Sequence, residues 1–178
     1  MKKILCICLS STLQRTITFE NLTLAEVNRS KYYREDASGK AINSARVLNQ
    51  LESGCVQALC PLGEENASAF LKLVERDELA LAYVPIPGKT RECWTLLDSA
   101  AGTTTELVVG EGAVSKSEKD KIQIAEIRLL KYLNDFLPEV DGVLLAGSRP
   151  ECWSEVLYSA ICGIVKDSTQ TGPSTDGI

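Results

Sequence analysis

Short apolar runs recur along this chain and are separated by segments with a different hydrophobic spacing. Residues 4–9 form a continuous apolar run, which is typical of a strand buried on both faces of a parallel sheet. Residues 55–60 and 142–146 have the same character. These three runs predict the buried strands of a central sheet.

Four other segments have apolar residues at the three-to-four-residue spacing of amphipathic helices. They begin at Lys40, cover residues 65–76, run from Ser115 to about Phe136, and begin again at Ser154. Ser115 and Glu118 also form a capping box, which is a start signal for the third helix. Because helices and buried strands alternate, the sequence predicts an α/β fold with a mainly parallel sheet.

Short runs of β-branched and aromatic residues predict a further set of strands that are less buried. They cover residues 16–19, 27–33, 83–86, 92–97 and 104–109. Polar residues and Pro-Gly or Ala-Gly turns separate them, which is the pattern of edge or hairpin strands.

The composition narrows the class of protein. With 178 residues, of which 44% are hydrophobic and 24% charged, the chain can build one globular domain. A net charge of −5 without any basic stripe argues against binding of nucleic acid. No apolar run approaches the length of a membrane span, and residues 4–15 do not resemble a signal peptide, so we expect a cytoplasmic protein. Residues 167–178 are rich in Ser, Thr and Gly and predict a disordered tail after a domain of residues 1–166.

The cysteines and the missing histidines limit the chemistry. The seven cysteines are odd in number and scattered, and several lie in apolar runs, which predicts free buried thiols. The absence of histidine removes Ser-His and Cys-His nucleophile pairs and histidine-bearing zinc sites. Any chemistry must come from carboxylates, lysine, arginine or a cofactor, and we predict no metal ligands.

Residues 37–48 form a small-residue turn that leads directly into a helix. Ser38 or Gly39 can occupy the N-cap, and the first helical turn offers unpaired N–H groups to an anion or a sugar oxygen. Lys40 adds a positive charge there, and Asn43 adds an amide that can donate and accept hydrogen bonds. On this local evidence alone, a capped surface helix with a solvated lysine is the simpler interpretation.

This segment resembles the substrate-binding signature of the ribokinase (pfkB) family of carbohydrate kinases, in which Gly-Gly-Lys-Gly precedes an asparagine and Ala-Arg. The matching residues are Gly39, Lys40, Asn43, Ala45 and Arg46. Ser38 and Ala41 replace two of the glycines. The flanking sequence is most similar to the 1-phosphofructokinase and tagatose-6-phosphate kinase branch. The resemblance covers residues 1–166, which correspond to the N-terminal portion of a family member.

The resemblance implies a ribokinase-like three-layer α/β/α fold with a mainly parallel central sheet, truncated at the C-terminus. It also implies a small β lid over the sugar, built from strands at about 14–35 and 88–109. Family members often dimerise through that lid, so a homodimer is implied as well.

The same resemblance implies a site for a phosphorylated sugar. Gln14 stands where the family has an aspartate that holds sugar hydroxyls, and Arg91 stands where the arginine of the phosphosugar branch meets the substrate's phosphate. A cross-strand ion pair with Glu106 is the alternative role for Arg91. The substrate-binding residues implied are Gln14, Gly39, Lys40, Asn43, Arg91, Glu106, Gly147 and Ser148.

The catalytic half of the family pattern has no counterpart in this sequence. Family members use ATP and magnesium, and their base is an aspartate in a Gly-Ala-Gly-Asp motif that also forms an anion hole. That motif occurs nowhere in the 178 residues. We therefore expect no catalytic residue here, no binding of ATP or Mg²⁺ by this chain alone, and negligible phosphoryl transfer.

Three interpretations remain open at this point. The chain is a member or fragment of a sugar-phosphate kinase, or a non-catalytic sugar-phosphate-binding or regulatory module, or an unrelated α/β interaction protein. The replacements at Gln14, Ser38 and Ala41 favour the second. The third predicts no sugar-phosphate binding and a structure without a lid.

Overall fold

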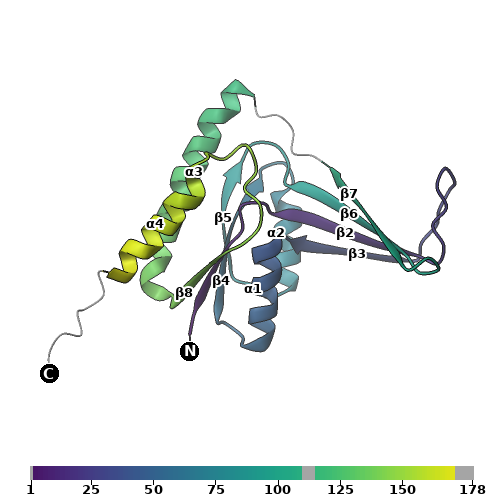
Figure 1. The fold of residues 1–178 in the computed structure, drawn as a ribbon, viewed down its shortest axis with the longest axis horizontal. Helices are drawn as coiled ribbons and strands as arrows, with labels where there is room; N and C mark the ends of the chain where they lie inside the picture. The colour runs from purple at the N-terminus through teal and green to yellow at the C-terminus, as the bar shows by residue number, and fades with distance from the viewer. Residues whose placement is uncertain (1, 110–114, 171–178) are drawn as a thin grey trace.

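The computed structural model of the protein describes residues 2–109 and 115–170 (Figure 1). Its strands are β1 (Ile4–Ile7), β2 (Thr12–Phe19), β3 (Tyr32–Ser38), β4 (Val56–Gly63), β5 (Leu81–Ile86), β6 (Arg91–Asp98), β7 (Thr103–Val109) and β8 (Gly142–Leu145). Its helices are α1 (Lys40–Leu51), α2 (Ala67–Arg76), α3 (Lys116–Phe136), the short 3-10 helix η1 (Leu137–Glu139) and α4 (Leu157–Gln170). None of the described helices is both long and apolar enough to span a bilayer.

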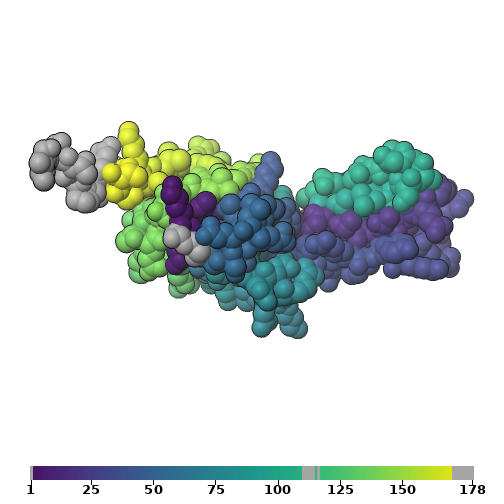
Figure 2. Space-filling view, turned by 90° about the horizontal axis from the view of Figure 1, so that it is seen from below, coloured from purple at the N-terminus to yellow at the C-terminus, as the bar shows by residue number. Residues whose placement is uncertain are grey.

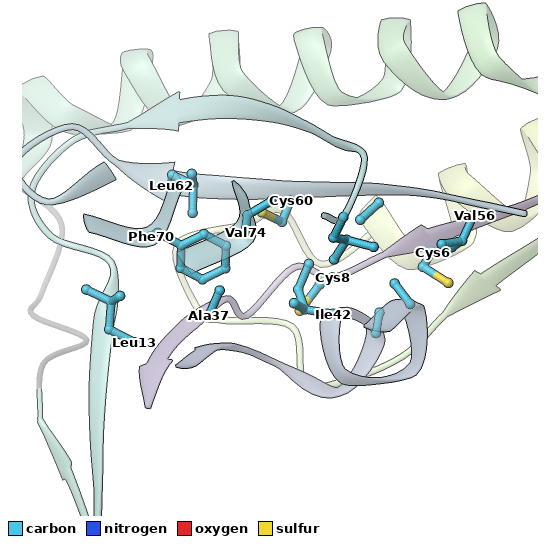
Figure 3. Close-up of a cluster of buried hydrophobic side chains, with 14 of the residues drawn as sticks. Cys6, Cys8, Leu13, Ala37, Ile42, Val56, Cys60, Leu62, Phe70 and Val74 are labelled. Carbon is cyan, nitrogen blue, oxygen red and sulfur yellow. The ribbon is translucent and has the colours of Figure 1, made fainter. Parts of the chain in front are cut away.

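The central sheet has the strand order β5-β4-β1-β8, and all of its neighbouring strands are parallel. Side chains of β1 alternate between two cores, as the period of a strand requires. Cys6 and Cys8 pack with α1 and α2, whereas Leu5 and Ile7 pack with α3 and α4. Figure 3 shows the first of these cores, where Phe70 of α2 lies among the buried side chains. The sheet and its two helical faces therefore form three layers.

The second sheet has the order β3-β2-β6-β7 and extends away from the layered body (Figures 1 and 2). Its central pair, β2 and β6, is parallel, and the two outer pairs are antiparallel. Because β2 follows β1 after a short turn, the base of this second sheet lies at the carboxyl end of the central strands. We call it the lid. The predicted three-layer α/β/α fold with a β lid is confirmed.

Three strands differ clearly from their predicted ranges. β2 begins at Thr12, four residues before the predicted start at residue 16. The strand expected at residues 27–33 lies instead at Tyr32–Ser38, because Asn28 closes the preceding loop through hydrogen bonds to the backbone N–H and carbonyl of Thr23. β4 continues beyond the predicted run of residues 55–60, through Pro61 to Gly63. It continues because Leu62 and Gly63 pair with the end of β5.

The C-terminal helix is longer than expected. α4 runs to Gln170, so residues 167–170 are helical, whereas the sequence predicted a disordered tail from residue 167. The hydroxyls of Ser168 and Thr169 donate to the carbonyls of Val165 and Lys166, which lets these polar residues continue the helix. The rest of the predicted tail, residues 171–178, lies outside the described residues.

The long helix α3 agrees with its predicted start and buried stripe. The backbone N–H of Ser115 donates to Glu118 Oε2 at 2.7 Å, which completes the expected capping box. Ile122, Ala125 and Leu129 are buried against the sheet. The helix therefore packs on one face of the central sheet, against β4 and β5, and its first turns project beyond the sheet (Figure 1).

All seven cysteines are free, and five of them are buried. Burial raises the pKa of Cys6 to about 11, and it raises the pKa of Cys60 well above its usual value. A buried thiol with a raised pKa carries little thiolate at neutral pH and reacts slowly. The predicted free buried thiols are confirmed.

We predict two classes of thiol in the native protein. Cys162 is exposed and Cys152 is partly exposed, so a thiol-specific reagent at pH 7.5 should modify these two and leave the five buried thiols unreacted. Unfolding in guanidinium should expose all seven. Stopped-flow titration with a chromogenic disulfide reagent measures both numbers. A native protein in which the buried thiols react as fast as Cys162 contradicts the packing described above.

Candidate functional site

Three strands of the lid place polar side chains side by side at its base. Thr12 of β2 lies opposite Ser38 of β3 and opposite Arg91 of β6. Directly opposite residues on neighbouring strands point to the same face of a sheet. Segments that are far apart in sequence therefore meet on one face, close to the end of β1.

The helix α1 begins against this base, and Gly39 makes the approach possible. Gly39 is the N-cap residue and has a φ of 129°, a region that favours glycine. A Cβ atom at this position would lie 2.5 Å from Cys8 Sγ and 3.0 Å from the carbonyl oxygen of Ser10. Only a residue without a side chain allows the first turn of α1 to lie this close to the end of β1.

The first turn of α1 differs from the outward-facing anion site that the sequence predicts. Burial raises the pKa of the Cys8 thiol, while hydrogen bonds from the backbone N–H groups of Ser10, Ile42 and Ala41 lower it. The backbone N–H groups of Ala41 and Ile42, in the first turn of α1, therefore lie near a buried sulfur. The positive charge of Arg91 also lowers this pKa, so Arg91 lies close enough to act on the same group.

The side chains of α1 can still contact a ligand, because Lys40 and Asn43 are exposed. Asn43 Oδ1 accepts a hydrogen bond from Ser38 Oγ at 3.2 Å and another from Arg46 Nη1 at 3.0 Å. Since Ser38 pairs with Thr12, this contact joins Asn43 to the polar face at the base of the lid.

Hydrogen bonds of its own side chain and of the preceding residue fix the position of Arg91. Its Nε and Nη2 atoms donate to Thr12 Oγ1 at 3.1 and 2.8 Å. The preceding residue, Thr90, is buried, and its N–H and carbonyl bond to the side-chain amide of Asn66 at 2.7 and 3.0 Å. Thr90 Oγ1 also accepts from the N–H of Gly63 at 2.9 Å. The end of β4 and the start of α2 therefore fix where Arg91 begins β6.

Gln14 and Glu106 lie farther out on the same face of the lid. Gln14 Nε2 donates to Thr95 Oγ1 at 2.7 Å, and Glu106 lies opposite Thr95 across β6 and β7. Thr95 is four residues from Arg91, which corresponds to about 13 Å along a strand. The strand register thus places Glu106 opposite Thr95 and not opposite Arg91. It does not give the directly opposed ion pair of Arg91 and Glu106 that was the alternative role for Arg91.

The turn after β8 reaches the start of α1 from the other side. Gly147 has a φ of 118°, and a Cβ atom there would lie 3.9 Å from the Cβ of Lys40. The carbonyl of Gly147 accepts a hydrogen bond from the hydroxyl of Tyr158 in α4. Ser148 follows and is exposed. Gly147 therefore lies beside Lys40, as expected for residues at the carboxyl ends of neighbouring strands.

A cavity of about 1270 Å³ opens next to this cluster, at the carboxyl edge of the central sheet. Its wall includes Ser10, Ser11, Arg91 and Trp153. The hydroxyl of Ser10 is buried and has no hydrogen-bond partner within the part of the chain that the structure describes. The turn of Ser10 and Ser11 separates this cavity from Gly39. Of the eight predicted site residues, Arg91 alone is part of the wall.

The predicted residues thus fall into three connected groups. Gly39, Lys40 and Gly147 surround the start of α1, and Asn43 lies one turn later in that helix. Arg91 lies at the base of the lid. Gln14 and Glu106 lie farther out on the lid, and Ser148 is exposed. Sequence reasoning missed the residues that connect these groups, namely Ser10, Ser11, Thr12, Asn66 and Thr90. The polar residues that directly follow the first apolar run are the signal that could have identified the first three.

Comparison with known proteins gives the family. Residues 1–163 match the pfkB family of carbohydrate kinases. The chain belongs to this family. Membership confirms the resemblance of the α1 segment and excludes the interpretation as an unrelated α/β interaction protein.

Solved structures with the same fold are about twice as long as this pfkB-family chain. Phosphofructokinase-2 from Escherichia coli, in complex with fructose-6-phosphate, has a TM-score of 0.75 at 17% identity, with 94% of this chain and 52% of that chain covered. A possible 1-phosphofructokinase from Thermotoga maritima has a TM-score of 0.77 at 19% identity, with coverage of 94% and 51%. A putative phosphofructokinase from Staphylococcus aureus has a TM-score of 0.72 at 20% identity, with coverage of 93% and 50%. At these identities the similarity shows the fold.

The family implies ATP and magnesium in full-length members. Within residues 2–109 and 115–170, no group of three or more Cys, Asp or Glu side chains could hold a metal ion. Carboxylate oxygens are the protein ligands that magnesium prefers.

We predict that Gly63→Ala disturbs the placement of Arg91. A Cβ atom at Gly63 would overlap the backbone of Lys89 and Thr90, so the start of β6 must move. The expected loss of stability is roughly 1–3 kcal/mol, as for an overpacked interior. Urea unfolding followed by circular dichroism measures it.

Gly163→Ala is the matched control, because a Cβ atom there meets nothing within 4 Å. Gly163 lies in α4, where alanine should stabilise the helix by about 0.5–1 kcal/mol. Equal effects of the two substitutions would mean that the contact of Gly63 with residues 89 and 90 is not close.

Proposed function

We propose that this chain binds a phosphorylated hexose, such as a fructose or tagatose phosphate, as the substrate-binding portion of a sugar-phosphate kinase. The observation that carries the proposal is the placement of Arg91. Its guanidinium lies at the edge of the cavity and at the base of the lid, bonded to Thr12 and close to the start of α1. A guanidinium suits this role because its fork of N–H donors matches the oxygens of a phosphate.

The other predicted residues can then contact the sugar itself. The amides of Gln14 and Asn43 and the carboxylate of Glu106 are suited to hydroxyl groups. Lys40 adds a positive charge beside the turn of Gly147 and Ser148. Of the predicted site residues only Arg91 lines the cavity of about 1270 Å³, so the sugar would lie on the lid side of the Ser10-Ser11 turn.

The proposed activity of this chain alone is binding without phosphoryl transfer. Transfer depends on positioning the nucleotide and on stabilising the charge of the moving phosphoryl group. The sequence contains no Gly-Ala-Gly-Asp motif to supply the catalytic base and the anion hole. Sugar-phosphate-dependent turnover of ATP by the purified chain, abolished by Arg91→Gln or Lys40→Ala, would overturn this part of the proposal.

A non-catalytic regulatory module is the second candidate. Gln14 favours it, because an amide bonded to Thr95 replaces the charged group that the family signature has at this position. The two candidates differ in the effect of Gln14→Asp. A kinase portion with a weakened sugar contact should bind its sugar phosphate more tightly after this change, whereas a module adapted to glutamine should bind it more weakly.

We predict that Arg91→Gln weakens binding of the sugar phosphate by roughly 10- to 100-fold, because a hydrogen bond to a charged group contributes about 1.5–3 kcal/mol. Isothermal titration calorimetry with fructose 1-phosphate, fructose 6-phosphate and tagatose 6-phosphate measures this effect. Arg128→Gln, at an exposed position of α3, is the control and should leave the affinity unchanged. The proposal fails if the unmodified chain binds none of the three compounds.

We also propose that two copies of the chain associate through their lids. The lid strands β3 and β7 expose large apolar side chains, with exposed fractions between 49% and 67%. They are Tyr32, Tyr33, Leu107, Val108 and Val109. Exposed strands with apolar residues tend to pair or to become covered. Phosphofructokinase-2 from Escherichia coli, which shares the fold, has itself been solved in a tetrameric inhibited form.

We predict that a double substitution, Leu107→Lys with Val109→Lys, converts the dimer into a monomer. These two positions lie opposite Trp94 and Glu92, on the face of the lid away from Gln14 and Thr95. Sedimentation velocity across a range of protein concentrations measures the change. Ile127→Lys on α3, 62% exposed in the native chain, is the control and should remain dimeric. A monomeric unmodified chain would exclude the lid interface.

A further inference from the structure

Arg46 connects three parts of the molecule through one guanidinium group. Its Nε donates to Asp77 Oδ2 at 2.7 Å, its Nη1 donates to Asn43 Oδ1 at 3.0 Å, and its Nη2 donates to the carbonyl of Ala37. The side chains of Arg46 and Asp77 are only 16% and 13% exposed. One side chain therefore joins α1, the C-terminal end of α2 and the end of lid strand β3.

This contact determines which end of the Asn43 amide faces a ligand. A guanidinium has five N–H donors and no acceptor, so the group that faces Arg46 must be the oxygen of Asn43. Ser38 Oγ, at 3.2 Å from the same oxygen, supplies a second donor. Both contacts therefore engage Oδ1, and the Nδ2 group remains as the part of this side chain that can donate to a ligand.

We propose that Arg46 is a positioning residue that presents the amide N–H groups of Asn43 to the sugar phosphate. This inference rests on the proposed function and deepens it. The ligand atom at Asn43 is then an acceptor, either a hydroxyl oxygen or a phosphate oxygen. An analogue that offers only a donor at this place, such as a protonated amino sugar, is disfavoured. Ser38, which replaces a glycine of the family signature, donates a hydrogen bond to the amide of Asn43 that a glycine could not make.

Asp77 keeps the guanidinium of Arg46 in place. Burial alone would raise the pKa of Asp77, but the hydrogen bonds and charges of Arg46 and Arg76 outweigh burial and lower it. Asp77 therefore stays ionised at neutral pH. Arg76 Nε lies 3.1 Å from Asp77 Oδ1, and Arg76 Nη2 lies 3.0 Å from Asp36 Oδ1 in β3. Arg76 thus shares the carboxylate of Asp77 with Arg46, but its other hydrogen bonds go to the carbonyl of Glu35 and the carboxylate of Asp36.

A double-mutant cycle tests whether Arg46 acts through Asn43. Arg46→Lys keeps the charge but lacks the fork that reaches three acceptors at once. We expect Arg46→Lys and Asn43→Ala each to weaken binding of fructose 6-phosphate by roughly tenfold, which corresponds to one charged hydrogen bond. The double variant should bind no more weakly than Asn43→Ala alone. Effects that multiply in the double variant would show that Arg46 acts independently and would overturn the proposal.

Arg76→Lys is the matched control, because it changes the other arginine bonded to Asp77. It should lower the unfolding midpoint to an extent similar to Arg46→Lys and leave the affinity for fructose 6-phosphate unchanged. An equal loss of affinity in both variants would assign the effect of Arg46 to general stability. Calorimetry is performed well below the unfolding midpoint of each variant.

A second measurement decides the orientation of Asn43 without any ligand. The side-chain NH₂ resonances of Asn43 are assigned in a ¹⁵N–¹H spectrum by their disappearance in Asn43→Ala. We expect them to shift in Arg46→Lys and not in Arg76→Lys. Unchanged resonances in Arg46→Lys would overturn the positioning role even if sugar phosphate binds. Failure of the unmodified chain to bind any sugar phosphate, with a shift present, would instead refute the proposed function alone.

Discussion

The close contact between the start of α1 and the end of β1 is the constraint on which the rest of the site depends. Gly39 fits there because a Cβ atom would overlap Cys8 and approach Ser10. Since Ser10 begins the turn that leads into β2, the same contact sets where the lid leaves the body. A helix N-terminus and the base of a separate sheet are thereby brought to one edge of the central sheet, where open α/β folds bind ligands.

Arg91 reaches this edge by a second, independent set of contacts. The end of β4 and the start of α2 hold Thr90 through Gly63 and Asn66, and β6 begins at the next residue. Thr12 then connects Arg91 to β2. The two sets of contacts come from different parts of the chain and meet at the base of the lid. Disruption of either set of contacts would move the side chain of Arg91 away from the start of α1 without unfolding the central sheet.

Hydrophobic spacing was sufficient to predict the buried strands and the helices, because their burial imposes a regular period on the sequence. The lid was less predictable at its edges. The start of β3 depends on Asn28, whose side chain forms hydrogen bonds with the backbone of the preceding loop. The hydrophobic pattern of a sequence does not reveal such hydrogen bonds. The apolar run of residues 55–60 stops before Pro61, but pairing with β5 extends the strand through this proline.

The site was predicted as a set of ligand-facing residues, and the residues that support them were not predicted. The signature at α1 marks Asn43 and Arg46 but does not say that one holds the other. Asn66 and Thr90 belong to segments that are 24 residues apart, and their pairing is a property of the folded chain. Sequence patterns identify side chains whose chemistry is distinctive, whereas supporting contacts use common polar residues that are recognisable only by position.

The contacts that support the proposed site come from within the described residues. Both hydrophobic cores, one on each face of the central sheet, are formed by residues of this chain. The contacts that hold the site, from Gly39 against Ser10 to Arg91 on Thr12, likewise join described residues to each other. Pre-organised groups bind a ligand without paying for reorganisation at the moment of contact. The described residues therefore supply the contacts that position Arg91 and the start of α1.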